Sequence, residues 1–253
     1  MKKEIWRERV SDLKMLLKRG VPQRWEALAD PRMREAVRSP DESRLALAID
    51  HTLLDSMATE KDIRRVCREA AQFRFGAVCI SPCWIPLAMA VRNEEKAVFR
   101  ISVVIDFPAG GEISATRVKA VENAFKKGCD EVDIVMPLGL FLSGDYIAVL
   151  EDLLAVKEAS RGAVKAILEM SRLNSVQKRD AALIAFSSGV DFLKTSTGVN
   201  GRAEREDVRL LRKIAGKFCG VKAAGGIRDR ETALSMLKAG ADRIGTSSGP
   251  ALI

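Results

Sequence analysis

Three lysines and two carboxylates fall within segments whose apolar, β-branched neighbours predict buried strands. In chain order they are Asp133, Lys165, Glu169, Lys194 and Lys222. An ammonium group without a partner is costly to bury. Three lysines on consecutive predicted strands, beside a carboxylate, therefore indicate a reaction centre. The alternative interpretation is a buried network of ion pairs that ties the interior of the protein together.

Glycines and hydroxylated residues follow two of these lysines and the last predicted strand. The sequence reads Lys-Thr-Ser-Thr-Gly at 194–198, Ala-Ala-Gly-Gly at 223–226 and Gly-Thr-Ser-Ser-Gly at 245–249. Glycine allows a phosphate to approach backbone N–H groups closely, and hydroxyl groups donate further hydrogen bonds. These loops predict a phosphate-binding site, and tight strand-to-helix turns are the alternative explanation.

The segments that must position these residues alternate between short β-branched runs and amphipathic runs. The predicted strands begin near Leu45, Gly76, Phe99, Asp130, Val164, Asp191, Gly220 and Arg243. The predicted helices include Thr116–Lys127, Tyr146–Glu158, Ser175–Ser187 and Arg230–Ala239, and three glycines are expected to end helices, namely Gly128, Gly189 and Gly240. Eight such units predict an α/β fold, a (β/α)8 TIM barrel whose site lies at the C-terminal ends of the strands. A doubly wound open sheet is the alternative.

The two ends of the chain depart from this repeat. Residues 1–44 are predicted to form an N-terminal helical extension packed on the barrel, because Trp6, Val10, Leu13 and Leu17 follow helical spacing. Residues 45–253 are predicted to form the barrel itself. Only Gly249–Ile253 follow the eighth predicted strand, which is too short for an ordinary helix, so we expect a truncated C-terminal end.

Composition narrows the classes of partner. The net charge is +8, from 42 basic and 34 acidic residues, but the signs alternate along the chain, which favours a small phosphorylated substrate over nucleic acid. No apolar run predicts a membrane span or a secretory signal, so a cytoplasmic protein is expected. Cys79 and Cys83 resemble half of a zinc site, but no second pair exists and His51 is the only histidine. We therefore expect no metal and no cofactor, and a homo-oligomer (dimer or tetramer) is compatible with the sequence.

The chain resembles the 2-deoxyribose-5-phosphate aldolases, class I aldolases on a (β/α)8 barrel. The resemblance runs from about residue 50 to residue 249 and rests on an ordered set of motifs on the predicted strands. These are Asp50-His-Thr-Leu-Leu54, Val78-Cys-Ile-Ser-Pro82, Asp106-Phe-Pro-Ala-Gly110, Asp130-Glu-Val-Asp-Ile-Val135, Phe192-Leu-Lys-Thr-Ser-Thr-Gly198, Val221-Lys-Ala-Ala-Gly-Gly-Ile-Arg228 and Arg243-Ile-Gly-Thr-Ser-Ser-Gly249.

The resemblance implies an activity and a set of site residues. Enzymes of this family cleave 2-deoxy-D-ribose 5-phosphate reversibly to D-glyceraldehyde 3-phosphate and acetaldehyde, without a metal. By position, the Schiff-base lysine falls on Lys194, the proton-relay carboxylate on Asp133 and the second lysine on Lys222. The phosphate-binding residues fall on Gly198, Gly225, Gly226, Gly245, Ser247 and Ser248. Another Schiff-base sugar-phosphate aldolase, and a phosphate-binding barrel without catalysis, are the alternatives.

The chemistry agrees with this implication. A lysine imine acts as the electron sink that an aldol cleavage needs, and the attacking amine must be neutral. A second ammonium group, that of Lys222, disfavours the charged form of Lys194. Lys165 either pairs with Asp133 and orients it or is a structural partner only. Thr52 contacts substrate or supports its loop, whereas His51 is expected to be structural.

Overall fold

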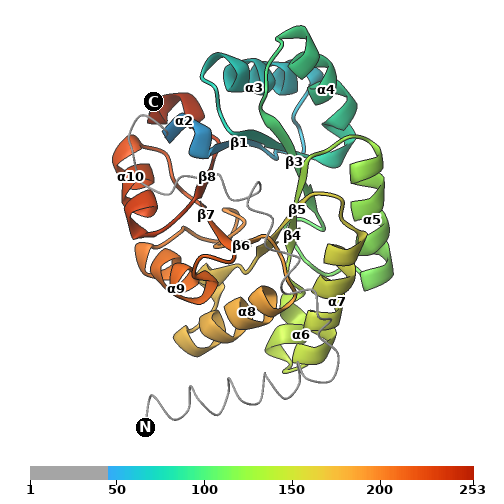
Figure 1. Ribbon diagram of the computed structural model, residues 1–253, viewed down its shortest axis with the longest axis vertical. Helices are drawn as coiled ribbons and strands as arrows, with labels where there is room; N and C mark the ends of the chain where they lie inside the picture. The colour runs from blue at the N-terminus through green and yellow to red at the C-terminus, as the bar shows by residue number, and fades with distance from the viewer. Residues whose placement is uncertain (1–44) are drawn as a thin grey trace.

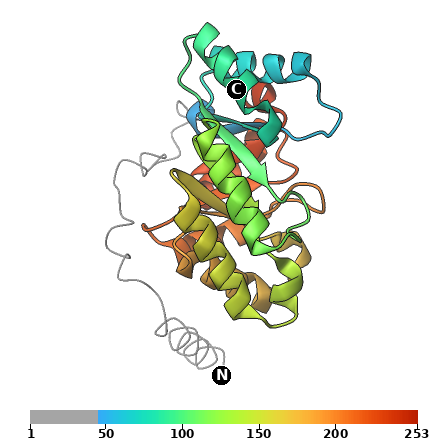
Figure 2. The same cartoon turned by 90° about the vertical axis from the view of Figure 1, so that its right-hand side faces the viewer.

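The computed structural model describes residues 45–253, and the predicted helical extension over residues 1–44 lies outside the described residues. Eight parallel strands close into a barrel in chain order, with β1 also paired to β8, and helices surround it (Figures 1 and 2). The strands are β1 (Ile49–Leu53), β2 (Ala77–Ile80), β3 (Arg100–Ile105), β4 (Glu131–Val135), β5 (Ala163–Ile167), β6 (Phe192–Lys194), β7 (Gly220–Ala224) and β8 (Arg243–Thr246). The predicted (β/α)8 barrel is confirmed.

Helices and short 3-10 turns connect the strands. The helices are α2 (Leu45–Ala48), α3 (Glu60–Gln72), α4 (Ile85–Glu94), α5 (Ser114–Lys126), α6 (Leu138–Leu142), α7 (Tyr146–Ala159), α8 (Ser175–Ser187), α9 (Arg205–Ala215) and α10 (Arg230–Ala239). The 3-10 turns are η4 (Pro82–Trp84), η5 (Met170–Arg172) and η6 (Gly249–Leu252). The short η6 follows β8 in the described part of the chain. Within residues 45–253, no helix combines the length and apolar character needed to cross a membrane.

Two element boundaries differ from the prediction. The run Leu45–Ala48 was expected to begin the first strand, but it forms the short helix α2, and the strand begins at Ile49. A short apolar run does not distinguish strand from helix, and both Leu and Ala favour helix. Glu169 was expected on the fifth strand, which instead ends at Ile167, so Glu169 lies in the loop beyond it.

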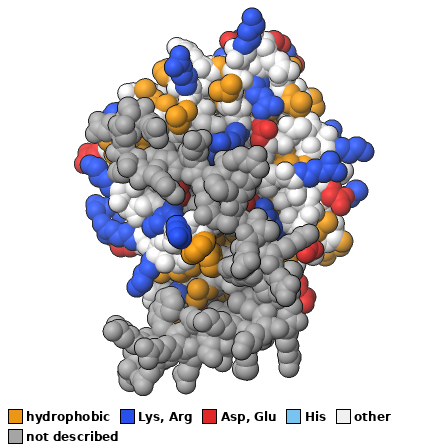
Figure 3. Space-filling model, in the orientation of Figure 1, with side chains coloured by type: hydrophobic (Ala, Val, Ile, Leu, Met, Phe, Trp, Pro, Cys, Tyr) orange, Lys and Arg blue, Asp and Glu red, His pale blue; other side chains and the backbone are white. Residues whose placement is uncertain are grey.

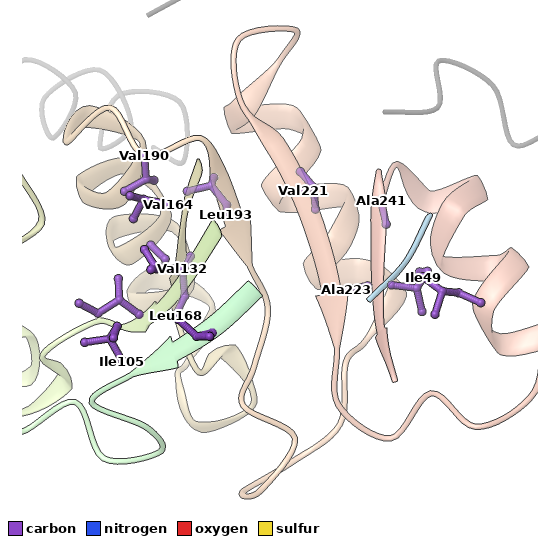
Figure 4. Close-up of a cluster of buried hydrophobic side chains, with 14 of the residues drawn as sticks. Ile49, Ile105, Val132, Val164, Leu168, Val190, Leu193, Val221, Ala223 and Ala241 are labelled. Atoms are coloured by element: carbon purple, nitrogen blue, oxygen red, sulfur yellow. The ribbon is translucent and has the colours of Figure 1, made fainter. Parts of the chain in front are cut away.

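The side chains of the barrel strands alternate between two different environments. Those that point outward are apolar and pack under the helices, as Val132, Val164 and Leu193 do on adjacent strands (Figure 4). Those at the intervening positions point into the barrel, and many of them are charged or polar although they are buried. The hydrophobic core therefore lies between the sheet and the helices, while the barrel interior is polar.

Three loops that lead into even-numbered strands share the sequence Gly-x-Asp. The glycine has a positive φ and ends the preceding helix, as predicted for these three glycines. Two residues later, the aspartate accepts the backbone N–H of the preceding strand and pairs with a cation from the helix before that strand. The three sets are Gly128–Asp130 with Ile101 and Arg92, Gly189–Asp191 with Val164 and Lys157, and Gly240–Asp242 with Val221 and Arg212.

The loop before β2, the remaining even-numbered strand, lacks the aspartate of this connection. Arg74 takes the positive-φ position and Gly76 the position of the aspartate, and the Gly76 N–H donates to Ala46 O at 3.2 Å. A Cβ atom at Gly76 would lie 2.1 Å from Leu47 O, so no aspartate fits there. The carboxylate connection therefore joins three of the four strand pairs.

Charged side chains outside these connections are spread over the surface. On the face drawn in Figure 3, basic and acidic side chains are scattered over the described residues, and the basic ones are the more prominent. Several of them form short-range pairs on one helix, such as Arg64 with Glu60 and Arg209 with Glu206. Exposed pairs of this kind contribute little to stability. The ion pairs of the Gly-x-Asp connections are partly buried, where solvent screens them less.

Substitution of Asp130 tests the contribution of these connections. Asp130→Ala removes the partner of the Arg92 guanidinium, which lies 2.6 Å from Asp130 Oδ2, and of the Ile101 N–H at 2.7 Å. We expect the free energy of unfolding to fall by about 2 kcal/mol in urea denaturation, since two charge-assisted hydrogen bonds are lost. Glu151→Ala, at an exposed position of α7, is the control and should change it by no more than about 0.5 kcal/mol. Equal changes in the two variants would contradict the interpretation.

Candidate active site

Asp133 is the centre of a buried cluster inside the barrel. Its Oδ2 accepts hydrogen bonds from Lys194 Nζ at 2.8 Å and from Lys222 Nζ at 2.7 Å. Its Oδ1 accepts from Lys165 Nζ at 2.8 Å and from Ser102 Oγ at 3.0 Å. The register explains this convergence, because Asp133 pairs with Lys165 on β5, and Lys194 pairs with Lys222 on β7. The three lysines and the carboxylate singled out in the sequence thus come together.

A second layer of charges holds two of these lysines. Lys222 Nζ lies 2.5 Å from Asp50 Oδ2, and Lys165 Nζ lies 2.6 Å from Glu131 Oε2. Arg243 binds both carboxylates, with its Nε 2.7 Å from Asp50 Oδ1 and its Nη1 3.4 Å from Glu131 Oε1. The cluster is therefore both a site and an ion-pair network, and the two sequence interpretations are not exclusive.

The network fixes the charge states of its members. Burial alone would raise the pKa of Asp133, but the ammonium groups of Lys165, Lys194 and Lys222 outweigh it and hold that pKa well below its usual value. Burial would likewise lower the pKa of Lys222, yet the carboxylates of Asp133 and Asp50 raise it above the usual value. The carboxylates of Asp133 and Glu131 raise the pKa of Lys165 against the effect of burial. Asp133 is therefore an anion at neutral pH, and Lys165 and Lys222 are cations.

Lys194 differs from the other two lysines in its surroundings. It is the last residue of β6, at the C-terminal end of the barrel, and 3% of its surface is exposed while Lys165 and Lys222 are at 0%. Asp133 is its one carboxylate partner among the described residues. Lys194 is thus the lysine that a molecule entering from this end meets first.

Glu169 fixes the loop that follows Lys194. It has a left-handed conformation with φ of 48°, and its buried carboxylate accepts a hydrogen bond from Thr197 Oγ1 at 2.5 Å and one from Ser171 Oγ at 3.2 Å. Thr197 Oγ1 in turn accepts from the Val199 N–H at 3.1 Å. Glu169 was singled out as part of the reaction centre, but its contacts place it against the loop rather than in the lysine cluster.

The predicted phosphate-binding glycines of the sixth and seventh loops lie against each other. Gly198, Gly225 and Gly226 all have positive φ, which only glycine adopts without strain. A Cβ atom at Gly198 would lie 3.3 Å from the Gly225 Cα, so the two backbones approach closely. The Ala203 N–H donates to Gly225 O at 2.9 Å and joins the two loops. These loops therefore form one glycine-rich surface at the C-terminal end of the barrel, in which Gly198 and Gly226 are exposed and Gly225 is buried.

The eighth loop continues this surface. Gly245 pairs with Ala224 of β7, and a Cβ atom there would lie 3.1 Å from Lys222 Cε. Ser247 is exposed, and the Ser248 N–H donates to Thr246 Oγ1 at 2.9 Å. The glycine therefore leaves room for the lysine stem, and Ser247 faces solvent at the C-terminal end of the barrel.

The two residues of the first strand have separate roles. Thr52 is half-buried, its hydroxyl donates to Asp50 O at 2.9 Å, and no contact of its side chain with the lysine cluster is present among the described residues. His51 points to the opposite side, where its Nε2 lies 2.6 Å from Glu69 Oε2 of α3. The geometry agrees with a structural His51.

Four members of the cluster were not expected from the sequence. Asp50, Ser102, Glu131 and Arg243 are all buried and contact the lysines or their partners. Ser102 pairs with Glu131 on the neighbouring strand, and Arg243 pairs with Lys222. Glu131 stands two positions before Asp133 on the same strand, and this alternation is the signal that could have found it. Asp50 and Arg243 have no charged residue two positions away in the sequence.

Possible metal ligands do not form a cluster in the described part of the chain. Between residues 45 and 253 no three His, Cys, Asp or Glu side chains are grouped so that they could hold an ion. Cys79 is buried in the barrel, whereas Cys83 is exposed in η4. Burial raises the pKa of Cys79, so its thiol stays protonated at neutral pH.

Comparison with known proteins adds an independent line of information. The model of the DeoC/LacD family aldolases matches residues 44–251. A deoxyribose-phosphate aldolase of Thermococcus gammatolerans is 43% identical over 213 residues, covering 83% of this chain and 95% of the relative. One from Desulfitobacterium hafniense is 45% identical, covering 83% and 97%. The tetrameric deoxyribose phosphate aldolase structure from Aeropyrum pernix superimposes with a TM-score of 0.76 at 29% identity, covering 88% of this chain and 94% of that one.

The depressed pKa values of the buried carboxylates predict how stability depends on pH. Burial opposes the shift, but Arg243 with Lys222 lowers the pKa of Asp50, and Arg243 with Lys165 lowers that of Glu131. Their ordinary values are 3.8 and 4.5. Near these values the unfolded chain binds protons that the folded chain does not, so the stability contribution is complete above them and is lost as the pH falls toward the lower folded-state values.

Urea denaturation over about pH 3 to pH 7 measures this dependence. The free energy of unfolding should fall steeply below about pH 4, and Glu131→Gln should reduce the number of protons taken up on unfolding by up to about one. Glu151→Gln, at its exposed position on α7, should leave the slope unchanged. A parent protein whose stability is flat from pH 3 to pH 7 would contradict the charge states assigned to the network.

Proposed function

The chain belongs to the DeoC/LacD family of aldolases, and we propose that Lys194 is the residue through which it forms the Schiff base of its reaction. That reaction is the reversible cleavage of 2-deoxy-D-ribose 5-phosphate to D-glyceraldehyde 3-phosphate and acetaldehyde by a class I aldolase. The observation that supports the assignment most strongly is the shared oxygen: Lys194 and Lys222 both bind Asp133 Oδ2. An ammonium this close disfavours a second positive charge on its neighbour.

Charge counting distinguishes Lys194 from the other lysines of the cluster. The ion-pair network inside the barrel joins four basic side chains, Lys165, Lys194, Lys222 and Arg243, to three carboxylates, Asp50, Glu131 and Asp133. The network therefore has one basic side chain more than it has carboxylates. Lys222 and Lys165 each have two close carboxylate partners, whereas Lys194 has one. Lys194 is therefore the amine least compensated by negative charge, and we assign the attack on the substrate to it.

The geometry supports a role for each member of the cluster in the reaction. The neutral Lys194 Nζ attacks C1 of the open-chain sugar, and loss of water from the carbinolamine gives the imine. The C2–C3 bond then breaks as the C3 hydroxyl loses its proton and C3 becomes the aldehyde carbon of D-glyceraldehyde 3-phosphate. The electrons of the broken bond move into the imine and form an enamine. Protonation at C2 and hydrolysis release acetaldehyde and free the amine. Asp133 holds the water or hydroxyl that carries these protons, and Lys165 orients Asp133.

The glycine-rich surface supports the proposed phosphate site. Backbone N–H groups of Gly198, Gly225, Gly226 and Gly245 and the hydroxyls of Ser247 and Ser248 are assigned to the 5-phosphate, as the resemblance implies. The three loops lie at one end of the barrel, above the lysine cluster. Thr52 is assigned to substrate support through its strand. A homo-oligomer in the cytoplasm is part of this proposal, and the Aeropyrum pernix relative is a tetramer.

Replacement of Lys194 tests the Schiff-base assignment. Lys194→Arg keeps a cation beside Asp133 but cannot form an imine, because a guanidinium stays protonated. Cleavage of deoxyribose 5-phosphate should fall to the background rate, and borohydride with acetaldehyde should no longer add mass to the peptide that contains residue 194. Borohydride labelling of Lys222 in the parent enzyme, with Lys194 unlabelled, would reverse the two roles.

Lys222→Leu is the companion variant. This variant lacks the ammonium that shares Asp133 Oδ2 with Lys194, so imine formation should persist but slow by about a hundredfold at pH 7. The rate of the variant should climb as the pH rises, more steeply than that of the parent. Circular dichroism should first establish that the variant folds, because Asp50 and Asp133 each lose a partner.

A charge at Ser247 tests the phosphate surface. Ser247→Asp places a carboxylate where the 5-phosphate is expected, and like charges repel, so KM for the phosphorylated sugar should rise by at least about tenfold. Steady-state kinetics on unphosphorylated deoxyribose provide the comparison and should change little. A uniform loss on both substrates would instead indicate a role in folding or in the chemistry at C1.

A further inference from the structure

Arg202 is the one charged residue between Lys194 and Glu204, in the loop that joins β6 to α9. Its aliphatic stem packs over Gly226 of the seventh loop. A Cβ atom at Gly226 would lie 2.8 Å from Arg202 Cγ and 3.2 Å from Arg202 Cδ. The absence of a side chain at Gly226 therefore makes room for the stem, which lies across the glycine-rich surface.

The backbone on either side of Arg202 is tied to the same surface. The Ala203 N–H donates to Gly225 O at 2.9 Å. A Cβ atom at Gly225 would lie 2.9 Å from Gly201 O, so these backbones are in contact as well. Arg202 is thus carried by a short segment that is held against the seventh loop, and its direction is set by packing.

The guanidinium of Arg202 has no acidic partner within residues 45–253. The acids nearest to it in sequence are engaged elsewhere: Glu204 lies 3.8 Å from Lys178 Nζ, and Glu206 lies 3.1 Å from Arg209 Nη1. The acid of the seventh loop, Asp229, accepts the Thr232 N–H at 2.7 Å and caps α10. An arginine positioned by packing, with these carboxylates occupied, is available to an external anion.

We propose that Arg202 binds the 5-phosphate of the substrate and gives the enzyme its preference for phosphorylated over free deoxyribose, an inference that rests on the proposed function. Arginine presents two parallel N–H donors to phosphate oxygens. The backbone N–H groups of the glycine-rich loops would take the remaining oxygens. Because the 5-phosphate is remote from the C1 carbon that Lys194 attacks, Arg202 contributes to binding of the phosphorylated substrate and leaves the chemical step unchanged.

A second arginine provides an internal comparison. Arg228 is also exposed and lies two residues after Gly226, in the same loop. No contact of its stem with a glycine of the surface is present among the described residues. Arg230, the next cation, donates to Leu252 O at 3.0 Å and fixes the C-terminal end. Packing against Gly226 therefore distinguishes Arg202 from its basic neighbours.

Four variants test the proposal in the full-length chain. Arg202→Gln removes the charge, Arg202→Lys keeps it without the paired donors, and Arg228→Gln removes the neighbouring charge. Arg161→Gln is the matched control, since Arg161 is an exposed arginine in the turn before β5, at the opposite end of the barrel. Steady-state kinetics on deoxyribose 5-phosphate and on deoxyribose are measured for each, together with binding of inorganic phosphate by calorimetry.

Arg202→Gln should raise KM for the phosphorylated sugar by about tenfold to a hundredfold with kcat unchanged, the usual effect of losing a charged hydrogen bond. It should weaken phosphate binding by a similar factor and leave deoxyribose kinetics as in the parent. Arg202→Lys should recover part of the loss, and Arg161→Gln should match the parent.

Three results would overturn the assignment: an unchanged KM in Arg202→Gln, an equal loss on both sugars, or an effect carried by Arg228→Gln alone. The phosphate titration separates this proposal from the function itself. A parent that binds phosphate through Arg202 but cleaves neither sugar would support the anion site and contradict the aldolase.

Discussion

The barrel depends on the sharing of one buried carboxylate among three lysines. Asp133 compensates the burial of Lys165, Lys194 and Lys222, and each of its oxygens is occupied by more than one donor. No member of this group could be buried alone, because an unpaired interior charge costs several kcal/mol. The same sharing places four basic side chains beside three carboxylates, so the network has one basic side chain in excess. One arrangement of charges thus stabilises the barrel and surrounds the amine that we propose as the nucleophile.

The stabilising ion pairs and the proposed nucleophile lie in two separate layers of the barrel. Deeper in the barrel, Asp50, Glu131 and Arg243 form ion pairs that do not reach the open end. Above them Lys194 stands at the end of β6, and the glycine-rich loops close around the position beyond it. The lower layer holds Lys165 and Lys222 charged and fixed in place, so the electrostatic environment of Lys194 exists before substrate arrives. Preorganisation of this kind lowers the reorganisation needed during the reaction.

Much of this arrangement could be predicted from sequence, for identifiable reasons. The barrel follows from the regular alternation of strands and helices, and the lysine cluster follows because three buried ammonium groups need a common partner. The deeper layer could not be predicted in the same way. Whether Arg243 stands level with Glu131, four strands away, depends on the stagger of the strands around the closed barrel, which no local pattern encodes. The short helix at Leu45–Ala48 was missed because its composition fits either structure.

The Gly-x-Asp connections are not repeated equally around the barrel. In three strand pairs an aspartate carboxylate accepts a backbone N–H of the neighbouring strand, while the pair of β1 and β2 has Gly76 in place of the aspartate. In the other three, the cation comes from the helix that precedes the odd-numbered strand, whereas α2, the short helix before β1, contains no cation. The barrel is therefore a ring of four strand pairs whose connections are not equivalent: three include a carboxylate that spans the pair, and the fourth has the close backbone contact at Gly76 in its place.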